Sequence, residues 1–303
     1  MQKSKFIWLS GRFVPWDNAK VHFLTHALHY GSAIFEGIRC YNTKKGPAIF
    51  RLNDHIDRFY DSAQIIEMKI PFPKEKIKKA ILELVKRNKL KECYIRPLAF
   101  YGPGRMGINP LGIKPMVGIA CWKWQAYFGK KAHDSGIRVA VSSWQRISPK
   151  AMPVQAKAAG NYVNSILAKI EALQGGYDEA ILLDAEGNVA EASGENVFIV
   201  ENNALLTPPK PDILEGITRN SIIEIAKNEG IEVREEYFTR DQLYTAEEAF
   251  LTGTAAEITP IREVDGRKIA NGKPGQITKK LQKKFFEIVH GKDSNYSKWL
   301  SFV

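Results

Sequence analysis

A single lysine stands in residues 155–162, QAKAAGNY, among small apolar residues and with no carboxylate nearby in sequence. Elsewhere the chain places its lysines among other charges, as in KEKIKK and TKKLQKK. Desolvation disfavours the charged ammonium form, so the Lys157 amine could act as a nucleophile and form a Schiff base with an aldehyde. A surface lysine whose alkyl chain covers apolar neighbours is the alternative, and this segment alone leaves it open.

A lone acid has a similar setting. Glu191 stands between alanines in VAEASGENVFI, just before a Ser-Gly turn. A buried carboxylate needs a cationic partner, and a protonated pyridine nitrogen would be one.

Two turns of small residues could bind anions. LEGITRNS places Gly216 before a helix that starts at Ile217 and Thr218, so free N–H groups and the helix dipole would face an anion. LTGTAAE offers the Thr254 hydroxyl and the two amides that follow it. Each signal is weak alone. With the amine and the acid, they suit a phosphorylated pyridine aldehyde and a carboxylate substrate.

The elements that would position these residues alternate in type. FIWLSGRFVPW predicts a hairpin turning at Ser10 and Gly11. Further strands are predicted over residues 47–52, 92–102, 116–124, 137–144, EAILLD and VFIVEN. Helices are predicted over 53–66 (capped by Asn53 or Asp54), over 74–88, from Lys157 to the glycines at 175–176, over 218–228 and over 277–289.

This order predicts an α+β (mixed α/β) fold with two domains. Residues 1–124 would form a small N-terminal α/β domain, and residues 137–303 a large domain carrying Lys157. Residues 125–136 lack apolar periodicity and would form the interdomain loop.

The composition favours an ordinary globular protein. The 303 residues are 44% hydrophobic and 25% charged, which is enough to build a buried core. The net charge is +11, but the lysines of 74–88 and 277–289 lie opposite an apolar stripe and predict solvated helix faces. No nucleic-acid-binding motif accompanies the charge. No membrane span or signal peptide is predicted, and the three scattered cysteines favour a reducing cytoplasm.

Three histidines could share one helix face. His22, His26 and His29 are spaced four and three apart, a pattern that could bind a metal. The segment has no nearby acid and ends in a glycine turn, so structural histidines are the favoured interpretation and no metal is predicted.

Six motifs, in order, then carry a family resemblance. They are HALHYGSAIFEGIR (26–39), YIRP (94–97), KAAGNY (157–162), EASGENVF (191–198), EGITR (215–219) and GTAAEITP (253–260). From about residue 6 to 289 the chain resembles the branched-chain amino-acid aminotransferases, which are class IV, fold type IV pyridoxal-phosphate enzymes with a D-amino-acid-aminotransferase-like architecture. Ala159 stands where close relatives often have glycine, and Glu215 stands where some have proline; neither departure removes a chemical group.

The resemblance implies a role for each residue near the cofactor, pyridoxal 5'-phosphate. Lys157 would form the Schiff base and then move protons as general base and acid. Glu191 would keep the ring nitrogen protonated, and Tyr162 would bind the ring's phenolic oxygen. The phosphate would be held by Arg58, by the helix start at Gly216, Ile217 and Thr218, and by Thr254, while Leu214 would pack on the ring. For Arg58, an ordinary exposed helix arginine remains the alternative.

The resemblance also implies a substrate pocket. The side chain would lie among Tyr30, Phe35, Trp124 and Tyr127, and the α-carboxylate would meet Thr254, Ala255 and Tyr94. Arg96 would receive the distal carboxylate of glutamate; stacking on an aromatic ring as part of the wall is its alternative role.

The implied reaction is a reversible ping-pong transfer of the amino group of leucine, isoleucine or valine to 2-oxoglutarate. A homodimer or an assembly of dimers is expected, with amino acids and 2-oxo acids as partners. Rival activities on the same fold are D-amino-acid aminotransferase, (R)-amine aminotransferase and aminodeoxychorismate lyase. A basic nucleic-acid-binding protein is the rival from another class.

Overall fold

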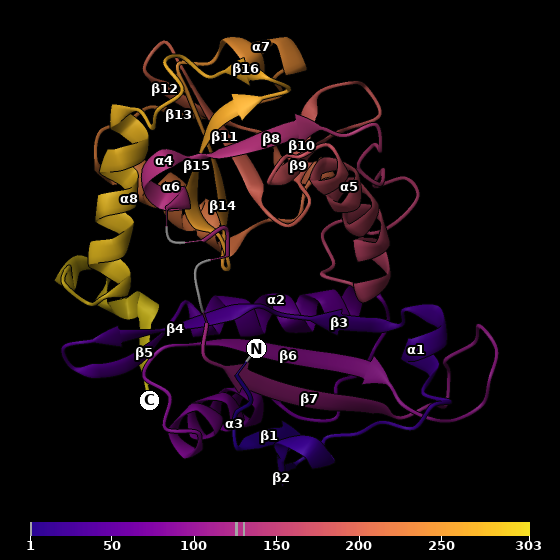
Figure 1. The fold of residues 1–303 in the computed structure, drawn as a ribbon. Coiled ribbons are helices and arrows are strands. Elements are labelled where there is room, and N and C mark those ends of the chain that lie inside the picture. The colour runs from indigo at the N-terminus through magenta and orange to yellow at the C-terminus, as the bar shows by residue number, and fades with distance from the viewer. Residues whose placement is uncertain (1, 125–126, 130) are drawn as a thin grey trace. The chain divides into compact units, whose positions relative to one another are not determined.

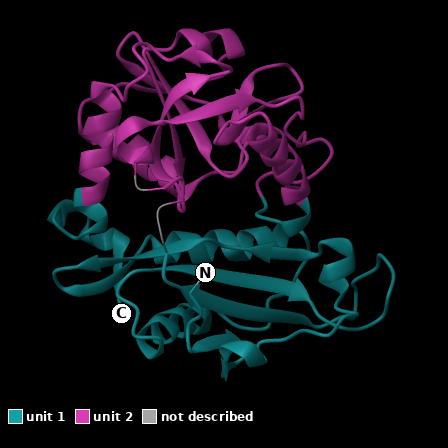
Figure 2. Cartoon of the chain, viewed as in Figure 1, with its two compact units in different colours: residues 1–124, 156–160, 287–303 teal, residues 125–155, 161–286 magenta. Residues whose placement is uncertain are grey.

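The computed structural model describes residues 2–124, 127–129 and 131–303, and the chain divides into two compact units (Figure 2). Unit 1 comprises residues 1–124, 156–160 and 287–303, and unit 2 comprises residues 125–155 and 161–286. The predicted division kept residues 137–303 together, whereas here Lys157 and the C-terminal segment belong to unit 1. Of the predicted interdomain loop, residues 125, 126 and 130 lie outside the described residues.

Unit 1 is built on an antiparallel sheet with the strand order β17-β5-β4-β6-β7-β1-β2, and β3 pairs with β6 (Figure 1). Its strands are β1 (Phe6–Leu9), β2 (Arg12–Pro15), β3 (Ala33–Phe35), β4 (Ile38–Thr43), β5 (Gly46–Phe50), β6 (Cys93–Tyr101), β7 (Pro115–Trp122) and β17 (Leu300–Phe302). Its helices are α1 (His26–Tyr30), α2 (Leu52–Ile65) and α3 (Lys74–Arg87), with short 3₁₀ turns η1 (Trp16–Asn18) and η4 (Ser294–Trp299).

Unit 2 is built on a mixed sheet with the order β10-β9-β8-β15-β14-β11-β12-β13, and β16 pairs with β15. Its strands are β8 (Ile137–Val141), β9 (Glu179–Leu183), β10 (Val189–Ala192), β11 (Asn196–Glu201), β12 (Ala204–Thr207), β13 (Val233–Glu235), β14 (Glu248–Gly253), β15 (Glu257–Val264) and β16 (Arg267–Lys268). Its helices are α4 (Ala132–Ser135), α5 (Tyr162–Gln174), α6 (Ile217–Asn228) and α7 (Arg240–Thr245), with 3₁₀ turns η2 (Ala159–Asn161), which begins in unit 1, and η3 (Lys210–Asp212). Helix α8 (Gln276–Val289) begins in unit 2 and ends in unit 1.

Backbone pairing explains why two later segments belong to unit 1. Strand β17 pairs antiparallel with β5, with Leu300 opposite Phe50. Residue 158 forms a bridge to Ile34 in β3. The two residues of each pair lie more than a hundred positions apart in sequence, so local sequence patterns could not predict these pairings.

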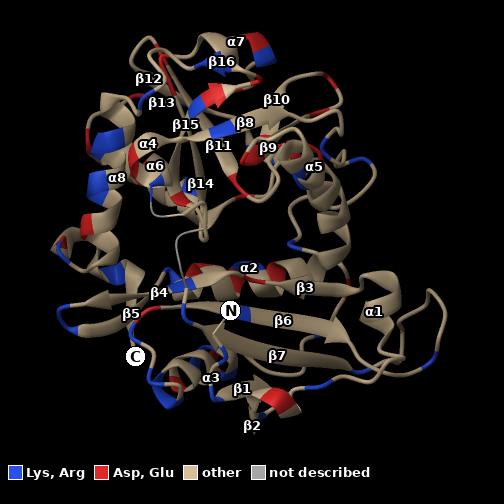
Figure 3. Cartoon of the chain, in the orientation of Figure 1, with Lys and Arg blue, Asp and Glu red and all other residues tan. Residues whose placement is uncertain are grey.

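The lysine-rich helices have the amphipathic faces that the sequence predicts. The stripe of α3, namely Ile77, Ala80, Ile81, Leu84 and Val85, is entirely buried in the core of unit 1, as predicted. Leu281 and Ile288 of α8 are buried as well. The polar face of α8 is mainly basic, since the helix carries four lysines and one glutamate, Glu287 (Figure 3).

The start of α2 differs from the prediction. The helix begins at Leu52 after Arg51, which adopts a left-handed conformation with φ 51°, and neither Asn53 nor Asp54 caps it. The Arg51 N–H donates to the Trp299 carbonyl at 2.7 Å, and its guanidinium lies 4.6 Å from the Trp299 ring centroid. A tertiary contact with the C-terminal segment therefore fixes the residue that precedes the helix, which has no side-chain cap.

Helix α5 buries small side chains and exposes several of its larger apolar ones. Its buried residues are Ala168 and Ala172, whereas Ile166 and Leu173 are 54% and 55% exposed. Among the described residues, no helix is long and apolar enough to span a membrane.

Candidate active site

The main chain of Lys157 is held on both sides. Its N–H donates to the buried Ser62 hydroxyl of α2 at 3.0 Å, and its carbonyl accepts from the Phe35 N–H at 3.0 Å. The Lys157 Nζ atom lies 5.2 Å from the Phe35 ring centroid. The backbone of the predicted nucleophile is therefore fixed by β3 and α2, and its amine lies over an aromatic ring.

A buried carboxylate that the sequence analysis did not single out orients Arg58. Glu36 is fully buried and accepts from Arg58 Nε at 2.7 Å, from Arg58 Nη2 at 2.9 Å and from His55 Nδ1 at 2.7 Å. Burial alone would raise the pKa of Glu36, but the charges and hydrogen bonds of Arg58 and His55 outweigh it and hold that pKa well below its usual value.

This cluster settles one alternative for Arg58. Its side chain is only 14% exposed, so it is not an ordinary exposed helix arginine. Burial lowers the pKa of His55, and the charges of Arg58 and Lys157 lower it further although Glu36 opposes them. His55 therefore lies within electrostatic reach of both predicted cofactor-binding cations.

The predicted substrate residues of unit 1 form an aromatic wall. The Tyr94 ring stacks on Trp124 at 4.5 Å, and the Arg96 guanidinium lies 4.8 Å from the Phe35 centroid and 5.4 Å from that of Tyr94. A Cβ on Gly37 would lie 1.9 Å from the Tyr94 hydroxyl, so a larger residue there would displace the Tyr94 ring. Tyr30, at the end of α1, is 43% exposed.

Glu191 of unit 2 has a cationic partner in the protein. Arg146 Nε donates to its Oε1 at 2.6 Å, and both side chains are less than a tenth exposed. Arg146 lies 45 residues away in sequence, and nothing in its segment, SSWQRISPK, pointed to this pairing. Buried Glu191 has a cationic partner, as expected of a buried acid, but this partner is Arg146, which the sequence analysis did not identify.

The second oxygen of Glu191 is tied to the segment that precedes α6. It accepts from Asn196 Nδ2 and from the Leu214 N–H, each at 3.2 Å, and Asn196 Nδ2 also donates to the Leu214 carbonyl at 3.0 Å. A Cβ on Gly216 would lie 2.0 Å from Asn196 Oδ1, so a larger residue here would displace the Asn196 side chain. Asn196 was also missed, although it lies inside a quoted motif.

The start of α6 has the form of an anion site. Gly216 is its N-cap, and among the described residues no side chain caps the helix. The first N–H groups of any helix have no intrahelical acceptor, so those of Ile217 and Thr218 can donate to an anion. Thr254 and Ala255 occupy the turn between β14 and β15 and are half-buried. Tyr162, half-buried, is the first residue of α5, and Tyr127 is 44% exposed.

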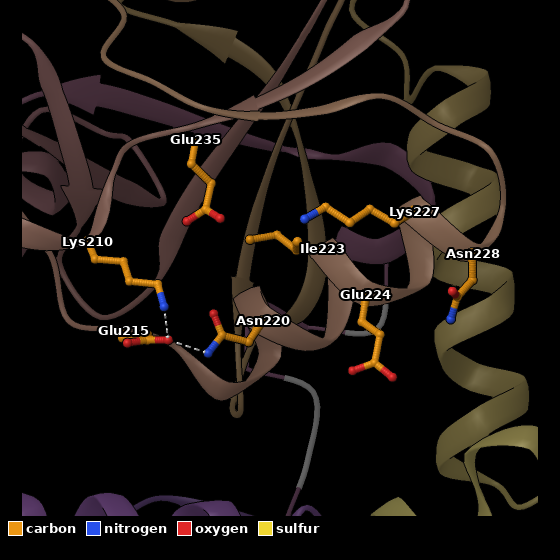
Figure 4. A pocket seen from close by; sticks show the side chains of 8 residues that line it. All are labelled: Lys210, Glu215, Asn220, Ile223, Glu224, Lys227, Asn228 and Glu235. Atoms are coloured by element: carbon orange, nitrogen blue, oxygen red, sulfur yellow. Dashed lines mark hydrogen bonds and ion pairs between the residues drawn. The ribbon is translucent and has the colours of Figure 1, made fainter.

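The departure at Glu215 is accommodated by its neighbours. Its carboxylate accepts from Lys210 Nζ and Asn220 Nδ2, each at 2.8 Å, on the wall of an open polar pocket of about 350 Å³ (Figure 4). Burial would raise the pKa of Glu215, but these partners outweigh it and lower it. The negative charge beside the start of α6 is thus largely compensated by Lys210.

The three histidines have protein partners. His26 is buried, with Nδ1 2.7 Å from the Ser32 hydroxyl and Nε2 2.8 Å from the Gly107 carbonyl. His22 accepts from the Leu24 N–H, and His29 contacts the Phe23 carbonyl. Only His26 and His29 lie on α1, so the three do not share one helix face. Over residues 2–124, 127–129 and 131–303, no cluster could hold a metal ion.

Comparison with known proteins identifies the family. The family described as amino-transferase class IV matches residues 33–264. A branched-chain-amino-acid aminotransferase of Pseudomonas aeruginosa is 49% identical over 98% of this chain and 97% of its own. The chain belongs to the branched-chain-amino-acid aminotransferases of class IV.

Solved structures of the same family confirm the predicted mixed α and β, two-domain fold class. A T.th. branched-chain amino acid aminotransferase with pyridoxamine 5'-phosphate is 50% identical, with a TM-score of 0.97 over 100% of this chain and 99% of its own. The same enzyme complexed with N-(5'-phosphopyridoxyl)-L-glutamate is 48% identical, with a TM-score of 0.96 over the same shares.

Replacing Glu36 by glutamine is expected to lower the free energy of unfolding by about 3–5 kcal/mol, because the Arg58 guanidinium loses the charge that compensates its burial and His55 Nδ1 loses a carboxylate acceptor. Urea unfolding measures it. The control is Glu83→Gln, which breaks the exposed Arg87 pair and should cost less than about 1 kcal/mol. Equal effects of the two substitutions would contradict the account.

The lowered pKa of Glu36 determines how the free energy of unfolding changes with pH. Because the folded-state pKa of Glu36 is lowered, its stabilising contribution is present above the unfolded value of about 4.3 and is lost as pH falls below it. Glu36→Gln should therefore shrink the acid-induced drop in unfolding free energy below about pH 4. An unchanged acid profile would contradict the prediction.

Proposed function

We propose that this chain transfers the amino group of L-leucine, L-isoleucine or L-valine to 2-oxoglutarate, reversibly and by a ping-pong scheme, with pyridoxal 5'-phosphate as cofactor. The setting of Lys157 carries the proposal: one amine over an aromatic ring, with its backbone fixed on both sides. Full-length relatives that bear this activity's name support it.

The residues present fit this cofactor. A primary amine suits its aldehyde, the uncapped start of α6 and the Arg58 guanidinium suit its phosphate, and the buried Glu191 carboxylate suits a protonated ring nitrogen. When bound, the cofactor supplies an electron sink for the substrate α-carbon.

The protein's own groups would then divide the work. Lys157 Nζ would take the proton from the substrate α-carbon and deliver it to the cofactor carbon that carried the aldehyde, which lies beyond the amine nitrogen. Glu191 would keep its negative charge because Arg146 offsets the cost of burying it. The Thr254 hydroxyl and the Ala255 amide would hold the substrate carboxylate, and Tyr162 would bind the ring's phenolic oxygen.

The same pocket has to accept an apolar side chain and a distal carboxylate. Phe35, Tyr94 and Trp124 provide apolar surface, whereas Arg96 provides charge. Arg96 Nε is buried and, within the described part of the chain, has no hydrogen-bond partner, while Nη2 makes only a long 3.4 Å contact to the Tyr94 hydroxyl. This weakly engaged guanidinium could pair with glutamate and remain stacked on Phe35 when leucine binds.

A homodimer, alone or within a larger assembly, is part of the proposal. Val163, Ile166, Ile170 and Leu173 form one apolar face of α5, and all are at least 46% exposed. In unit 1, Phe23 is 76% exposed and Leu28 62%. An exposed apolar helix face of this kind favours a protein partner, and a second copy of the chain is the simplest one. The free, buried cysteines suit the proposed reducing cytoplasm.

Replacing Lys157 by alanine is expected to lower leucine turnover by about 10⁴-fold or more, since nucleophile and proton carrier are lost together. The control Lys157→Arg keeps a cation over Phe35 and should be equally inactive. Cofactor binding, measured by equilibrium dialysis, should survive in both. Turnover within about tenfold of wild type would contradict the assignment.

Replacing Arg96 by methionine keeps volume and removes charge. It should lower kcat/KM for 2-oxoglutarate by roughly 30-fold or more, because a charge-assisted pair costs about 2–5 kcal/mol when broken. The half-reaction with leucine should change less than about fivefold. Stopped-flow measurement of each half-reaction decides the matter. Equal losses would mean that Arg96 only supports the wall.

The dimer is tested on α5. Ile166→Asp combined with Ile170→Asp should shift sedimentation velocity toward the monomer, because two desolvated carboxylates disfavour an apolar interface. The control Lys227→Asp places a carboxylate on the exposed surface of α6 and should leave sedimentation unchanged. A wild-type chain that sediments as a monomer would refute the dimer.

A further inference from the structure

Two buried carboxylates meet in unit 2, outside the residues discussed so far. Glu179 on β9 is 0% exposed and Glu195, just before β11, is 5% exposed. The segments that carry them are joined by the Ser193 N–H, which donates to the Ala180 carbonyl at 3.2 Å, and the charge of Glu179 acts on Glu195. Two adjacent carboxylates cannot both ionise cheaply in a buried place, so one of them holds a proton.

Lys169 of α5 connects this pair to the segment that carries Tyr127. Its Nζ atom donates to Glu179 Oε2 at 2.7 Å and to the Asp178 carbonyl at 2.7 Å. The same atom lies 5.1 Å from the Phe128 centroid and 5.6 Å from that of Tyr127. The ammonium group thus holds the two rings by cation–π attraction while it is itself held by Glu179.

At its other end the pair supports the Thr254 turn. A Cβ on Gly253 would lie 3.1 Å from Glu195 Cγ, so the Glu195 side chain packs directly on the bare Gly253 backbone. Its Oε2 accepts from the Gly194 N–H at 3.2 Å, and its carbonyl accepts from the Ala192 N–H at 2.7 Å. Gly253 immediately precedes Thr254, so a shift of Glu195 would move the turn.

The charges fit one protonation pattern. The charged groups that face Glu195 are Glu179 from β9 and Lys169 from α5, while β14 presents Gly253. Burial and then the Glu179 charge raise the pKa of Glu195 well above its usual value, and Lys169 only partly opposes them. Neutral Glu195 leaves Glu179 and Lys169 as a balanced pair.

We propose that Lys169, Glu179 and Glu195 are positioning residues: together they form a buried bridge that sets the Tyr127–Phe128 segment and the Thr254–Ala255 turn in register for substrate. The inference rests on the proposed function, in which those two segments contact the amino acid. None of the three touches the substrate. They act through the segments that do.

The first test is Lys169→Met, which keeps the alkyl chain and removes the charge. KM for leucine and for 2-oxoglutarate should rise about tenfold, with kcat within about threefold, because the segments lose alignment and the chemistry is intact. Hydrogen exchange of the peptide that contains Tyr127 and Phe128 should quicken. Lys169→Arg, which keeps charge and ring contact, should restore both readouts, and the exposed-surface control Lys283→Met should change neither.

The second test is Glu195→Gln, which mimics the protonated carboxyl. A raised folded-state pKa means that wild-type stability is full below the unfolded value of about 4.3 and declines as pH rises toward the folded value. Wild-type Tm should fall over that window, and Glu195→Gln should flatten the fall. An unchanged profile would overturn the shared-proton bridge.

The outcomes separate the two proposals. If wild type does not transaminate leucine, the proposed function fails, while hydrogen exchange and Tm still report on the bridge. If wild type is active but Lys169→Met leaves exchange of the Tyr127–Phe128 peptide unchanged, or lowers kcat and kcat/KM equally, the bridge is overturned.

Discussion

Two hydrogen bonds on the Lys157 main chain, one from its N–H to Ser62 and one from Phe35 to its carbonyl, are the constraint on which the proposed chemistry depends. They hold residues 156–160 against β3 although the residues on either side of that segment belong to unit 2. A flexible lysine would lose effective concentration against its substrate, and a fixed backbone limits that loss to the side chain. Strand β3 and helix α2 of unit 1 therefore position the backbone that carries the Lys157 amine.

Buried acids recur in both units, and each of three has its own cation. Glu36 is matched by Arg58, Glu191 by Arg146, and Glu179 by Lys169. Such pairs add little net stability compared with apolar packing, because desolvation offsets the attraction. What they do supply is fixed orientation: Arg58 and Glu191 are held in place before any ligand arrives. Pre-oriented charge is what electrostatic catalysis requires.

Local patterns predicted the local structure. The stripe of α3, the hairpin at Ser10 and Gly11, and the helix start after Gly216 follow from periodicity and turn chemistry, and the structure has all three. Lys157 and Glu191 stood out because a charged residue in an apolar stretch is unusual, and AIFEGI carried the same signal for Glu36. No such signal marked Arg146, Lys169 or Arg51, because their roles depend on tertiary contacts that local sequence patterns do not indicate. The exposed apolar residues of α5 show the same limit, because an apolar stripe indicates a face that packs against something and does not identify the partner.

The most direct test of the account is a titration of the cofactor-loaded chain with single amino acids in the absence of any oxo acid. The account predicts that L-leucine, L-isoleucine, L-valine and L-glutamate each abolish the visible absorbance band of the cofactor and release one equivalent of the matching 2-oxo acid. 2-Oxoglutarate should then restore the band, and D-leucine and D-glutamate should leave it unchanged. Loss of the band with the D-amino acids, or no response to L-leucine, would contradict the assignment.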